Sequence, residues 1–282
     1  MAKVSVIIPT RQSSRTIETC LRSIAAQSHR NIDVIVADSN SSDGTVEKAL
    51  GLGATVLPFP ADAERTHKKN EAARHSGSDF LLFLDSDIEL TEDVVAECLK
   101  ACESSDAVII PQRAPPRGGY WAKCRALEVL TYEGDDLVES PTFFRKDVFF
   151  AAGAFDERLV FGEENDLALR VRKMGFRVPR IESHVWHHEG SLIGVIMRKF
   201  YYGRTAPSYL KKARGTAFAQ FSPVRLAWFR NQQMLARDPL HATGMVVQKF
   251  VQYLAAGIGL AFGLVEGLAA SLAGAVRKEH AH

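Results

Sequence analysis

Short apolar runs recur along the first half of the chain and alternate with segments of helical periodicity. Apolar residues at helical spacing predict helices around residues 17–24 and 94–99. Strand and helix alternating in this way predict a mostly parallel α/β sheet flanked by helices. Five runs, each nearly continuous in apolar residues, predict strands buried on both faces: residues 4–8, 32–37, 55–57, 80–84 and 107–111.

The alternation stops at Gly190, and the chain that follows reads as helices. Leu192, Val195 and Phe200 belong to an apolar stripe with basic and tyrosine residues close by. Such helices lie in a membrane interface or pack against a neighbouring domain, and the sequence leaves both interpretations open.

Residues 250–276 are mostly apolar and approach the ~20 residues that a bilayer span requires. Glu266 is costly in a simple lipid-exposed span. We interpret the segment as a membrane-embedded or reentrant helix, or a helical hairpin, at about residues 244–276; a soluble dimerisation helix is the alternative. Within this segment a glycine occurs at every fourth position, at Gly259, Gly263 and Gly267. This spacing allows close helix packing or self-association.

The chain has 282 residues, a net charge of +2 and 9% aromatic residues, and none of these values indicates a nucleic-acid partner. Basic residues gather, however, between residues 198 and 237, where there is no Asp or Glu. Such a segment suits an anionic phospholipid surface, and an ordinary solvated basic face is the alternative. The basic residues are Arg198, Lys199, Arg204, Lys211, Lys212, Arg214, Arg225, Arg230 and Arg237.

The four cysteines, Cys20, Cys98, Cys102 and Cys124, form no C-x-x-C pair and are too few for a zinc site. We interpret them as reduced, structural cysteines of a cytosol-facing protein. The first apolar run already begins at Val4, so we expect no signal peptide before the fold.

In parallel α/β sheets, ligands bind at the carboxyl ends of the strands. The first predicted strand is followed by Pro9, Thr10 and Arg11, without a glycine, which disfavours a dinucleotide-binding loop and a P-loop. The second ends at Asp38, which small polar residues follow. Its carboxylate can accept hydrogen bonds from a nucleobase or ribose, or the stretch is a plain turn before a helix.

Two carboxylates follow the fourth apolar run, in the sequence Asp85-Ser86-Asp87. Carboxylates that emerge from a buried strand are costly unless a positive group meets them. Mg²⁺ or Mn²⁺ with a diphosphate is the natural partner, because these ions prefer oxygen ligands and substrate phosphates. A D-x-D triplet also occurs by chance, and its position at a strand end is what favours a metal site.

A second acidic group, Glu163, Glu164 and Asp166, leads into a predicted helix. Acidic residues in a first helical turn stabilise the helix dipole, and this is one interpretation. The other is a general base for an incoming hydroxyl group. Further along the chain come His187 and His188, and a single histidine in such a place is more often structural than a metal ligand.

Taken in order, these motifs resemble those of the family 2 glycosyltransferases, which have the GT-A fold. The resemblance implies a GT-A catalytic domain at residues 1–190 and a helical, membrane-associated region at residues 191–282. The family's usual Glu-Asp pair is Glu163-Glu164 here, one methylene longer at the base position. The match covers about residues 3–190 through six ordered segments: residues 4–10, 37–45, 69–73, 78–87, 144–157 and 163–170.

The resemblance also implies a role for each residue of the site. Asp87 would ligate Mn²⁺ or Mg²⁺ together with His187, with His188 as the adjacent alternative. Glu164 would act as the general base, with Glu163 and Asp166 as rivals. The nucleotide sugar would be bound by Pro9, Thr10, Arg11, Asp38, Lys69, Asn70, Asp85 and Ser86.

The reaction implied is an inverting, metal-assisted transfer of a hexose from GDP-mannose, or alternatively a UDP-sugar, to a lipid-linked or cell-surface glycan. A lipid phosphate acceptor would need no base. The protein would lie at the cell membrane with its catalytic domain facing the cytoplasm, and the C-terminal helix could link copies into a homo-oligomer.

Two other classes of function are alternatives to a glycosyltransferase. A sugar-1-phosphate nucleotidyltransferase would want a glycine-rich, basic loop after the first strand, and the sequence there is Pro9-Thr10-Arg11-Gln12-Ser13. The other alternative is a non-catalytic sugar-nucleotide-binding module. Such a module would not need catalytic and metal-binding residues, and this sequence retains Asp85, Asp87, Glu164 and His187.

Overall fold

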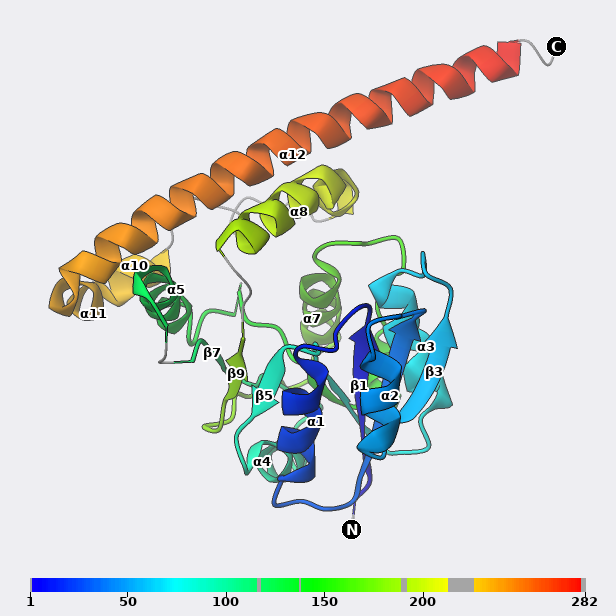
Figure 1. Cartoon of the computed structure of the whole chain (residues 1–282), viewed down its shortest axis with the longest axis vertical. Coiled ribbons are helices and arrows are strands. Elements are labelled where there is room, and N and C mark those ends of the chain that lie inside the picture. The colour runs from blue at the N-terminus through cyan, green and yellow to red at the C-terminus, as the bar shows by residue number, and fades with distance from the viewer. Residues whose placement is uncertain (1, 116–117, 137, 189–191, 213–225, 280–282) are drawn as a thin grey trace.

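A computed structural model describes residues 2–115, 118–136, 138–188, 192–212 and 226–279. Figure 1 shows an α/β domain with two long helices lying across one end of it. The strands are β1 (Val4–Thr10), β2 (Ile32–Ser39), β3 (Thr55–Phe59), β4 (Phe80–Phe83), β5 (Ile88–Leu90), β6 (Ala107–Val108), β7 (Gln112–Arg113), β8 (Phe143–Arg145) and β9 (Val185–His187). The helices are α1 (Ile17–Ala25), α2 (Thr45–Gly51), α3 (Arg65–His75), α4 (Val94–Ala101), α5 (Tyr120–Thr131), α6 (Lys146–Ala151), α7 (Glu163–Lys173), α8 (Leu192–Lys212), α10 (Leu226–Arg230), α11 (Gln232–Arg237) and α12 (Pro239–Glu279).

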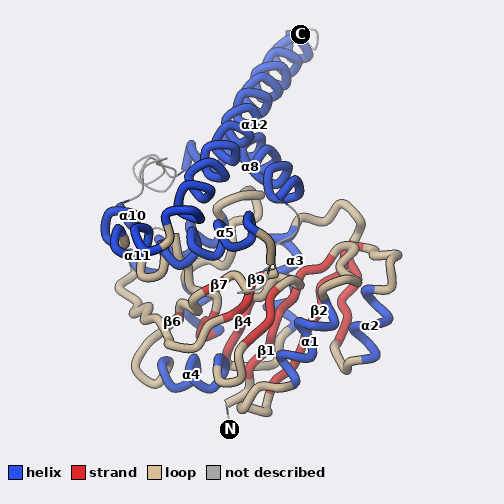
Figure 2. Tube along the Cα trace, turned by 60° about the vertical axis from the view of Figure 1, so that its left-hand side comes forward, coloured by secondary structure: helices blue, strands red, loops and turns tan. Residues whose placement is uncertain are grey.

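Six strands form the main sheet, in the order β3-β2-β1-β4-β8-β6. Strands β1 to β4 are parallel, and β8 runs antiparallel to β4 and β6. Every residue of β1 is buried, as its continuous apolar run predicts. Its side chains alternate between two cores: α1 and α4 contribute to one, and α3, α6 and α7 to the other. Figure 2 shows the strands between these layers of helices.

A second sheet of three short strands, in the order β5-β9-β7, lies beside the main one. In it β5 pairs antiparallel with β9, with Ile88 opposite His187. Because β5 starts directly after Asp87, this pairing brings the end of β9 next to the acidic triplet.

The mostly parallel α/β sheet is confirmed, and its predicted strands appear as β1, β2, β3, β4 and β6. Helix α7 includes the acidic residues in its first turn, because Gly162 takes a φ of 79° just before it and Glu163 is its first residue. All four cysteines are free and buried, as expected of structural cysteines.

Helix α12 is one continuous helix of 41 residues, so the structure has a single helix and no hairpin at residues 244–276. Among the described residues, its segment Pro239–Leu268 is the one helix long and apolar enough to cross a membrane, by length and composition. In Figure 1, α12 lies along α8 and then over α5.

Helices α8 and α12 approach each other backbone to backbone. A Cβ atom added to Gly203 would collide with a carbonyl group of α12, and one added to Gly259 or Gly263 would collide with carbonyl groups of α8. Gly267 has no such neighbour. Two of the three regularly spaced glycines of α12 therefore serve a contact within the chain, as small residues do wherever helices pack closely.

Ion pairs join α12 to the helices beneath it. Arg204 of α8 donates two hydrogen bonds, of 2.8 and 2.7 Å, to the carboxylate of Glu266. Lys249 pairs with Glu128 of α5, a buried carboxylate that also pairs with Arg125. Burial raises the pKa of Glu128, but the two cations lower it to about 2, so this carboxylate is ionised.

We expect alanine at position 259 to separate the two helices, because its methyl group has no room against α8. Gly259→Ala should lower the thermal unfolding midpoint, with an overpacking cost of about 1–3 kcal/mol. Gly257→Ala is the matched control, because nothing lies within 4 Å of a Cβ there. It should raise the midpoint slightly, because alanine favours helix by up to ~1 kcal/mol. Equal shifts in the two variants would contradict the close contact.

Candidate active site

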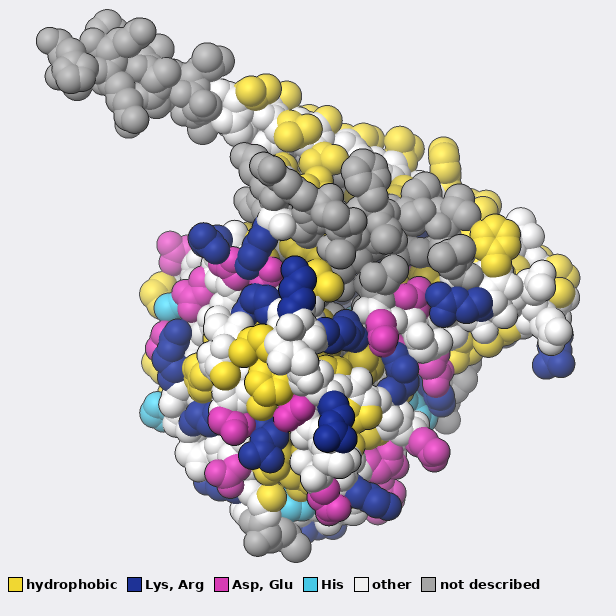
Figure 3. Space-filling model, turned by 180° about the vertical axis from the view of Figure 1, so that it is seen from behind, with side chains coloured by type: hydrophobic (Ala, Val, Ile, Leu, Met, Phe, Trp, Pro, Cys, Tyr) yellow, Lys and Arg dark blue, Asp and Glu magenta, His cyan; other side chains and the backbone are white. Residues whose placement is uncertain are grey.

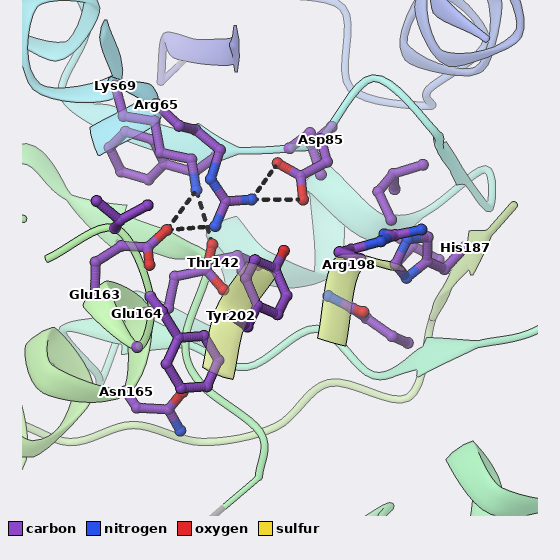
Figure 4. A pocket seen from close by; sticks show the side chains of 18 of the residues that line it. Arg65, Lys69, Asp85, Thr142, Glu163, Glu164, Asn165, His187, Arg198 and Tyr202 are labelled. Carbon is purple, nitrogen blue, oxygen red and sulfur yellow. Dashed lines mark hydrogen bonds and ion pairs between the residues drawn. The ribbon is translucent and has the colours of Figure 1, made fainter. Parts of the chain in front are cut away.

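A pocket lies at the carboxyl end of the main sheet, beneath α8 (Figure 4). Side chains from α3, the end of β4, the start of α7, β9 and α8 line it, so segments far apart in the sequence meet there. The predicted residues in its lining are Lys69, Asp85, Glu163, Glu164 and His187. The predicted residues outside its lining are Pro9, Thr10, Arg11, Asp38, Asn70, Ser86, Asp87 and Asp166.

Arg65 connects the two acidic motifs. Its Nη1 lies 3.2 and 3.1 Å from the two carboxylate oxygens of Asp85, and its Nη2 pairs with Glu163 (Figure 4). Burial raises the pKa of Asp85, but the neighbouring charges, Arg65 first among them, lower it to about 2. Asp85 is therefore a carboxylate at neutral pH, and the arginine supplies the positive group that the strand-end position requires.

The adjacent glutamates differ in how far they reach the pocket. The side chain of Glu163 is 2% exposed, whereas that of Glu164 is 34% exposed and accepts a hydrogen bond of 2.7 Å from Lys69 Nζ. The positive charge of Lys69 lowers the pKa of Glu164, although burial acts in the opposite direction. Of the two glutamates, Glu164 is thus the one that an incoming group can contact, and it is ionised at neutral pH.

Asp166 lies in the same turn of α7 but has other partners. Its carboxylate pairs with Arg170 and with Lys212, the last residue of α8, at 2.8 Å each. Lys212 also pairs with Asp156 at 2.6 Å. These contacts tie the end of α8 to the α/β domain, and the role of Asp166 as a base stays a prediction.

Asp87 and His187 are brought together by the pairing of β5 with β9. His187 Nε2 lies 3.4 Å from Asp87 Oδ2. His188 instead donates its backbone N–H to the carbonyl of Asp87 at 2.9 Å, while its ring contacts Glu89 at 2.7 Å. Of the two histidines, it is His187 whose imidazole faces Asp87. A carboxylate oxygen and an imidazole nitrogen at this separation suit one divalent cation, the carboxylate fitting Mn²⁺ or Mg²⁺.

Asp38 lies in the strand next to Thr10, where the register of β1 and β2 pairs the two residues. Its carboxylate accepts hydrogen bonds from the hydroxyl of Thr10 at 2.7 Å and from the hydroxyl and backbone N–H of Ser41 at 2.6 and 2.7 Å. Lys68 donates to the carbonyl of Thr10 at 2.8 Å. These bonds fix the strand-end loop, and its contact with a nucleobase stays a prediction.

Asn70 is used within the fold. Its amide accepts from the backbone N–H of Phe155 at 3.1 Å and donates to the carbonyl of Phe155 and the carboxylate of Glu157, both at 2.9 Å. Lys69 points into the pocket from the same helix. Of the two residues of the motif, Lys69 therefore faces the site, whereas Asn70 holds the loop before α7.

A different group of potential metal ligands lies on α3 and the loop that Asn70 holds. Ligand atoms of His67, Glu71 and Glu157 lie within 4.8 Å of one another. His67 and Glu157 already contact each other at 2.9 Å, and Glu71 pairs with Arg74. None of the group lines the pocket, and mutual pairing accounts for its proximity.

Arg65, Arg198 and Tyr202 also line the pocket, and the sequence motifs assigned none of them to it. Arg65 precedes Lys69 by four residues, so both side chains lie on one face of α3, and this spacing was the available signal. Tyr202 stacks on Phe161, with ring centroids 5.1 Å apart. No local pattern connects α8 to the site, because the contact is made through the tertiary fold.

A model of the family "Glycosyl transferase family 2" matches residues 5–155. The chain is 25% identical over 195 residues to the amylovoran biosynthesis glycosyltransferase AmsB of Erwinia amylovora, covering 61% of this chain and 65% of that protein. It is 24% identical over 157 residues to the GalNAc(5)-diNAcBac-PP-undecaprenol β-1,3-glucosyltransferase of Campylobacter jejuni, covering 54% of this chain and 48% of that protein. The match thus spans less than two thirds of either relative.

Among solved structures, the chain resembles the mannosyltransferase PcManGT from Pyrobaculum calidifontis, in complex with GDP-Man and Mn²⁺. The TM-score is 0.60 at 18% identity, and the match covers 93% of this chain and 87% of that one. At this identity the likeness concerns the fold, and it confirms the predicted GT-A arrangement.

Proposed function

The chain belongs to glycosyl transferase family 2, and from this premise we propose that it transfers a sugar from a nucleoside-diphosphate sugar to an acceptor, with inversion at the anomeric carbon. One observation carries the proposal: Asp85 just after β4, the first turn of α7 and the last residue of β9 meet in one pocket. They supply two acidic motifs and an imidazole, the groups needed to hold a charged donor and to activate an acceptor.

The donor's diphosphate would lie on the side of the pocket formed by the end of β4 and β9. Asp87 and His187 would hold Mn²⁺ or Mg²⁺, and the bound ion would offset the negative charge on the departing diphosphate. Asp85, kept ionised by Arg65, would accept hydrogen bonds from the donor's hydroxyl groups.

Glu164 is the general base that we propose for a hydroxyl acceptor. Its carboxylate is accessible from the pocket, whereas Glu163 is buried against Arg65. In this role Glu164 takes the proton from the hydroxyl as its oxygen attacks the anomeric carbon. A lipid phosphate acceptor arrives already deprotonated, and Glu164 would then only position it.

For the donor we propose GDP-mannose, with UDP-sugars as the alternative. Support comes from the fold that the chain shares with a mannosyltransferase whose structure contains GDP-Man and Mn²⁺. For the acceptor we propose a lipid-linked glycan or lipid phosphate. The matched relative from Campylobacter jejuni is named for an undecaprenol-linked acceptor.

A lipid acceptor fits the exposed apolar surface of α12. Exposed side chains recur along it every three or four residues, and Figure 3 shows apolar side chains along this helix. They include Phe250, Leu254, Ile258, Phe262 and Val265. We propose that this stripe, the α12 apolar stripe, contacts the cell membrane, with the catalytic domain facing the cytoplasm.

Part of the basic stretch between residues 198 and 237 is paired with carboxylates of the chain itself. Arg204 and Lys212 are engaged in ion pairs within the chain. Arg214 and Arg225 lie outside the described residues.

Calorimetric binding of GDP and UDP, with and without Mn²⁺, tests the donor site. We expect one nucleoside diphosphate to bind tightly, and only with the metal. Asp87→Asn should abolish this binding, because it removes the charged ligand of the proposed ion. Glu71→Gln is the matched control from the other ligand group and should bind like the wild type. Folded wild-type protein that binds neither nucleotide would overturn the proposal.

Glu164→Gln distinguishes the acceptor classes. With a hydroxyl acceptor it should lower kcat by about 10²–10⁴-fold, and with a polyprenyl phosphate it should leave kcat near the wild-type value. Because Lys69 lowers the pKa of Glu164, the wild-type rate should stay level through neutral pH and fall only on the acidic side, as the carboxylate gains its proton. Glu71→Gln, which changes a carboxylate outside the pocket, should retain activity; near-normal turnover by Glu164→Gln on a hydroxyl acceptor would contradict the assignment.

Flotation with anionic phospholipid vesicles tests the α12 apolar stripe. The wild-type protein should float with the vesicles, and the double variant Phe250→Ser, Leu254→Ser should float several-fold less, because two large apolar side chains are lost from the interface. Leu50→Ser with Met174→Ser, two exposed apolar residues of the α/β domain, is the matched control. Equal flotation of both double variants would exclude the stripe as the contact.

A further inference from the structure

The basic side chains of the pocket differ in how they are paired. Arg65 and Lys69 bind carboxylates of the pocket itself, and Arg125 binds Glu128 within α5 at 2.8 Å. Arg198, which enters the lining from α8, makes no hydrogen bond and no ion pair with another residue that the structure describes. A guanidinium group in a polar pocket without such a partner is available for an anionic ligand.

The position of Arg198 indicates which anionic group it would bind. Figure 4 shows its guanidinium group beside the ring of His187, away from the Glu163 and Glu164 side of the pocket. His187 is the residue whose imidazole faces Asp87 at 3.4 Å. Arg198 thus lies beside the part of the site where the donor's diphosphate would bind.

From this geometry we propose that Arg198 is a diphosphate-binding residue, whose guanidinium contacts the β-phosphate of the nucleotide-sugar donor. The inference rests on the proposed function, because it takes the donor to be a nucleoside-diphosphate sugar. An arginine suits the task, since its planar fork of N–H groups matches two phosphate oxygens, which the single ammonium group of a lysine does not.

The contact would strengthen as the reaction proceeds. The acceptor oxygen forms a bond to the anomeric carbon while the bond from that carbon to the β-phosphate oxygen breaks, and the electron pair stays on the phosphate. A hydroxyl acceptor gives its proton to Glu164. Negative charge therefore grows on the phosphate next to Arg198, and a fixed positive group at that point lowers the barrier.

Helix α8, which carries Arg198, is held in place at its middle and at its C-terminal end. Its glycine contacts with α12 fix the middle of the helix, and Lys212 ties its end to Asp156 and Asp166. Tyr209 packs against Gly162, so close that a side chain at position 162 would collide with its ring. Helix α8, which packs along α12, thus contributes Arg198 to the proposed donor site.

The experiment compares diphosphates with monophosphates. Calorimetry with Mn²⁺ measures the Kd of GDP, UDP, GMP and UMP for the wild type, Arg198→Ala and Arg198→Lys. We expect Arg198→Ala to weaken the nucleoside diphosphate that the wild type binds by about 10–100-fold, the effect of losing a charged hydrogen bond, and to change the matching monophosphate less than ~2-fold. Arg198→Lys should recover part of the loss.

Two controls separate the contact from other effects. Met197→Ala changes the exposed neighbour on α8, and Arg74→Ala removes one positive charge outside the pocket. Both should bind as the wild type does, and all variants should share its thermal unfolding midpoint.

Three outcomes would overturn the inference. If Arg198→Ala lost the same affinity for the monophosphate as for the diphosphate, Arg198 would act through the overall electrostatic field of the pocket or through its fold, and not through the β-phosphate. Unchanged affinity of Arg198→Ala for the nucleoside diphosphate would exclude Arg198 as a contact of the β-phosphate. A wild type that binds neither nucleotide would overturn the proposed function itself, and the inference with it.

Discussion

Carboxylates gathered at the carboxyl end of a parallel sheet have to be neutralised, and the arrangement of the site depends on this constraint. Asp85, Glu163 and Glu164 converge from two different elements, and like charges at such distances disfavour one another's ionised forms. Arg65 and Lys69 meet all three, because they lie one helical turn apart on α3 and point the same way. Removing one partner of such a network leaves an uncompensated charge, which is costly when buried. The network therefore locks the relative positions of α3, α7 and the end of β4, and with them the shape of the pocket.

The second constraint is the close contact of α8 and α12. Glycine at positions 203, 259 and 263 lets two backbones touch, and this contact carries α8 over the open side of the α/β domain. The pocket is consequently completed by a helix that belongs to the C-terminal third of the chain, with Tyr202 stacked on Phe161 at the entry to α7. A lipid-bound acceptor approaching along α12 would meet the site from this same side. The glycine contacts between α8 and α12 therefore also determine which helix covers the pocket.

The main strands could be predicted from the sequence, because they follow from local periodicity. The position of the acidic motifs near strand ends could be predicted as well, because ligands bind at the carboxyl ends of parallel strands. The sequence named both His187 and His188, and only the register of β5 with β9 shows which ring faces Asp87. No local pattern marks Arg65, because a basic residue on a helix is usually solvated and its ion pairs depend on residues from two other parts of the fold. By sequence, Arg198 belongs to a basic stretch that suits either a membrane surface or solvent, and nothing local indicates that α8 folds back over the pocket. Side-chain pairing across long sequence distances is what periodicity cannot encode.

The ion pair between Lys69 and Glu164 bears on the general base that we propose. Lys69 Nζ lies 2.7 Å from the Glu164 carboxylate, and its positive charge lowers the pKa of Glu164. A carboxylate with a lowered pKa is a weaker base, because catalytic efficiency follows basicity. In the proposed reaction the ion pair with Lys69 keeps Glu164 ionised at neutral pH but lowers its basicity. A lysine beside the proposed base therefore ensures that the carboxylate is ready to accept a proton, and makes it a weaker base than a free glutamate.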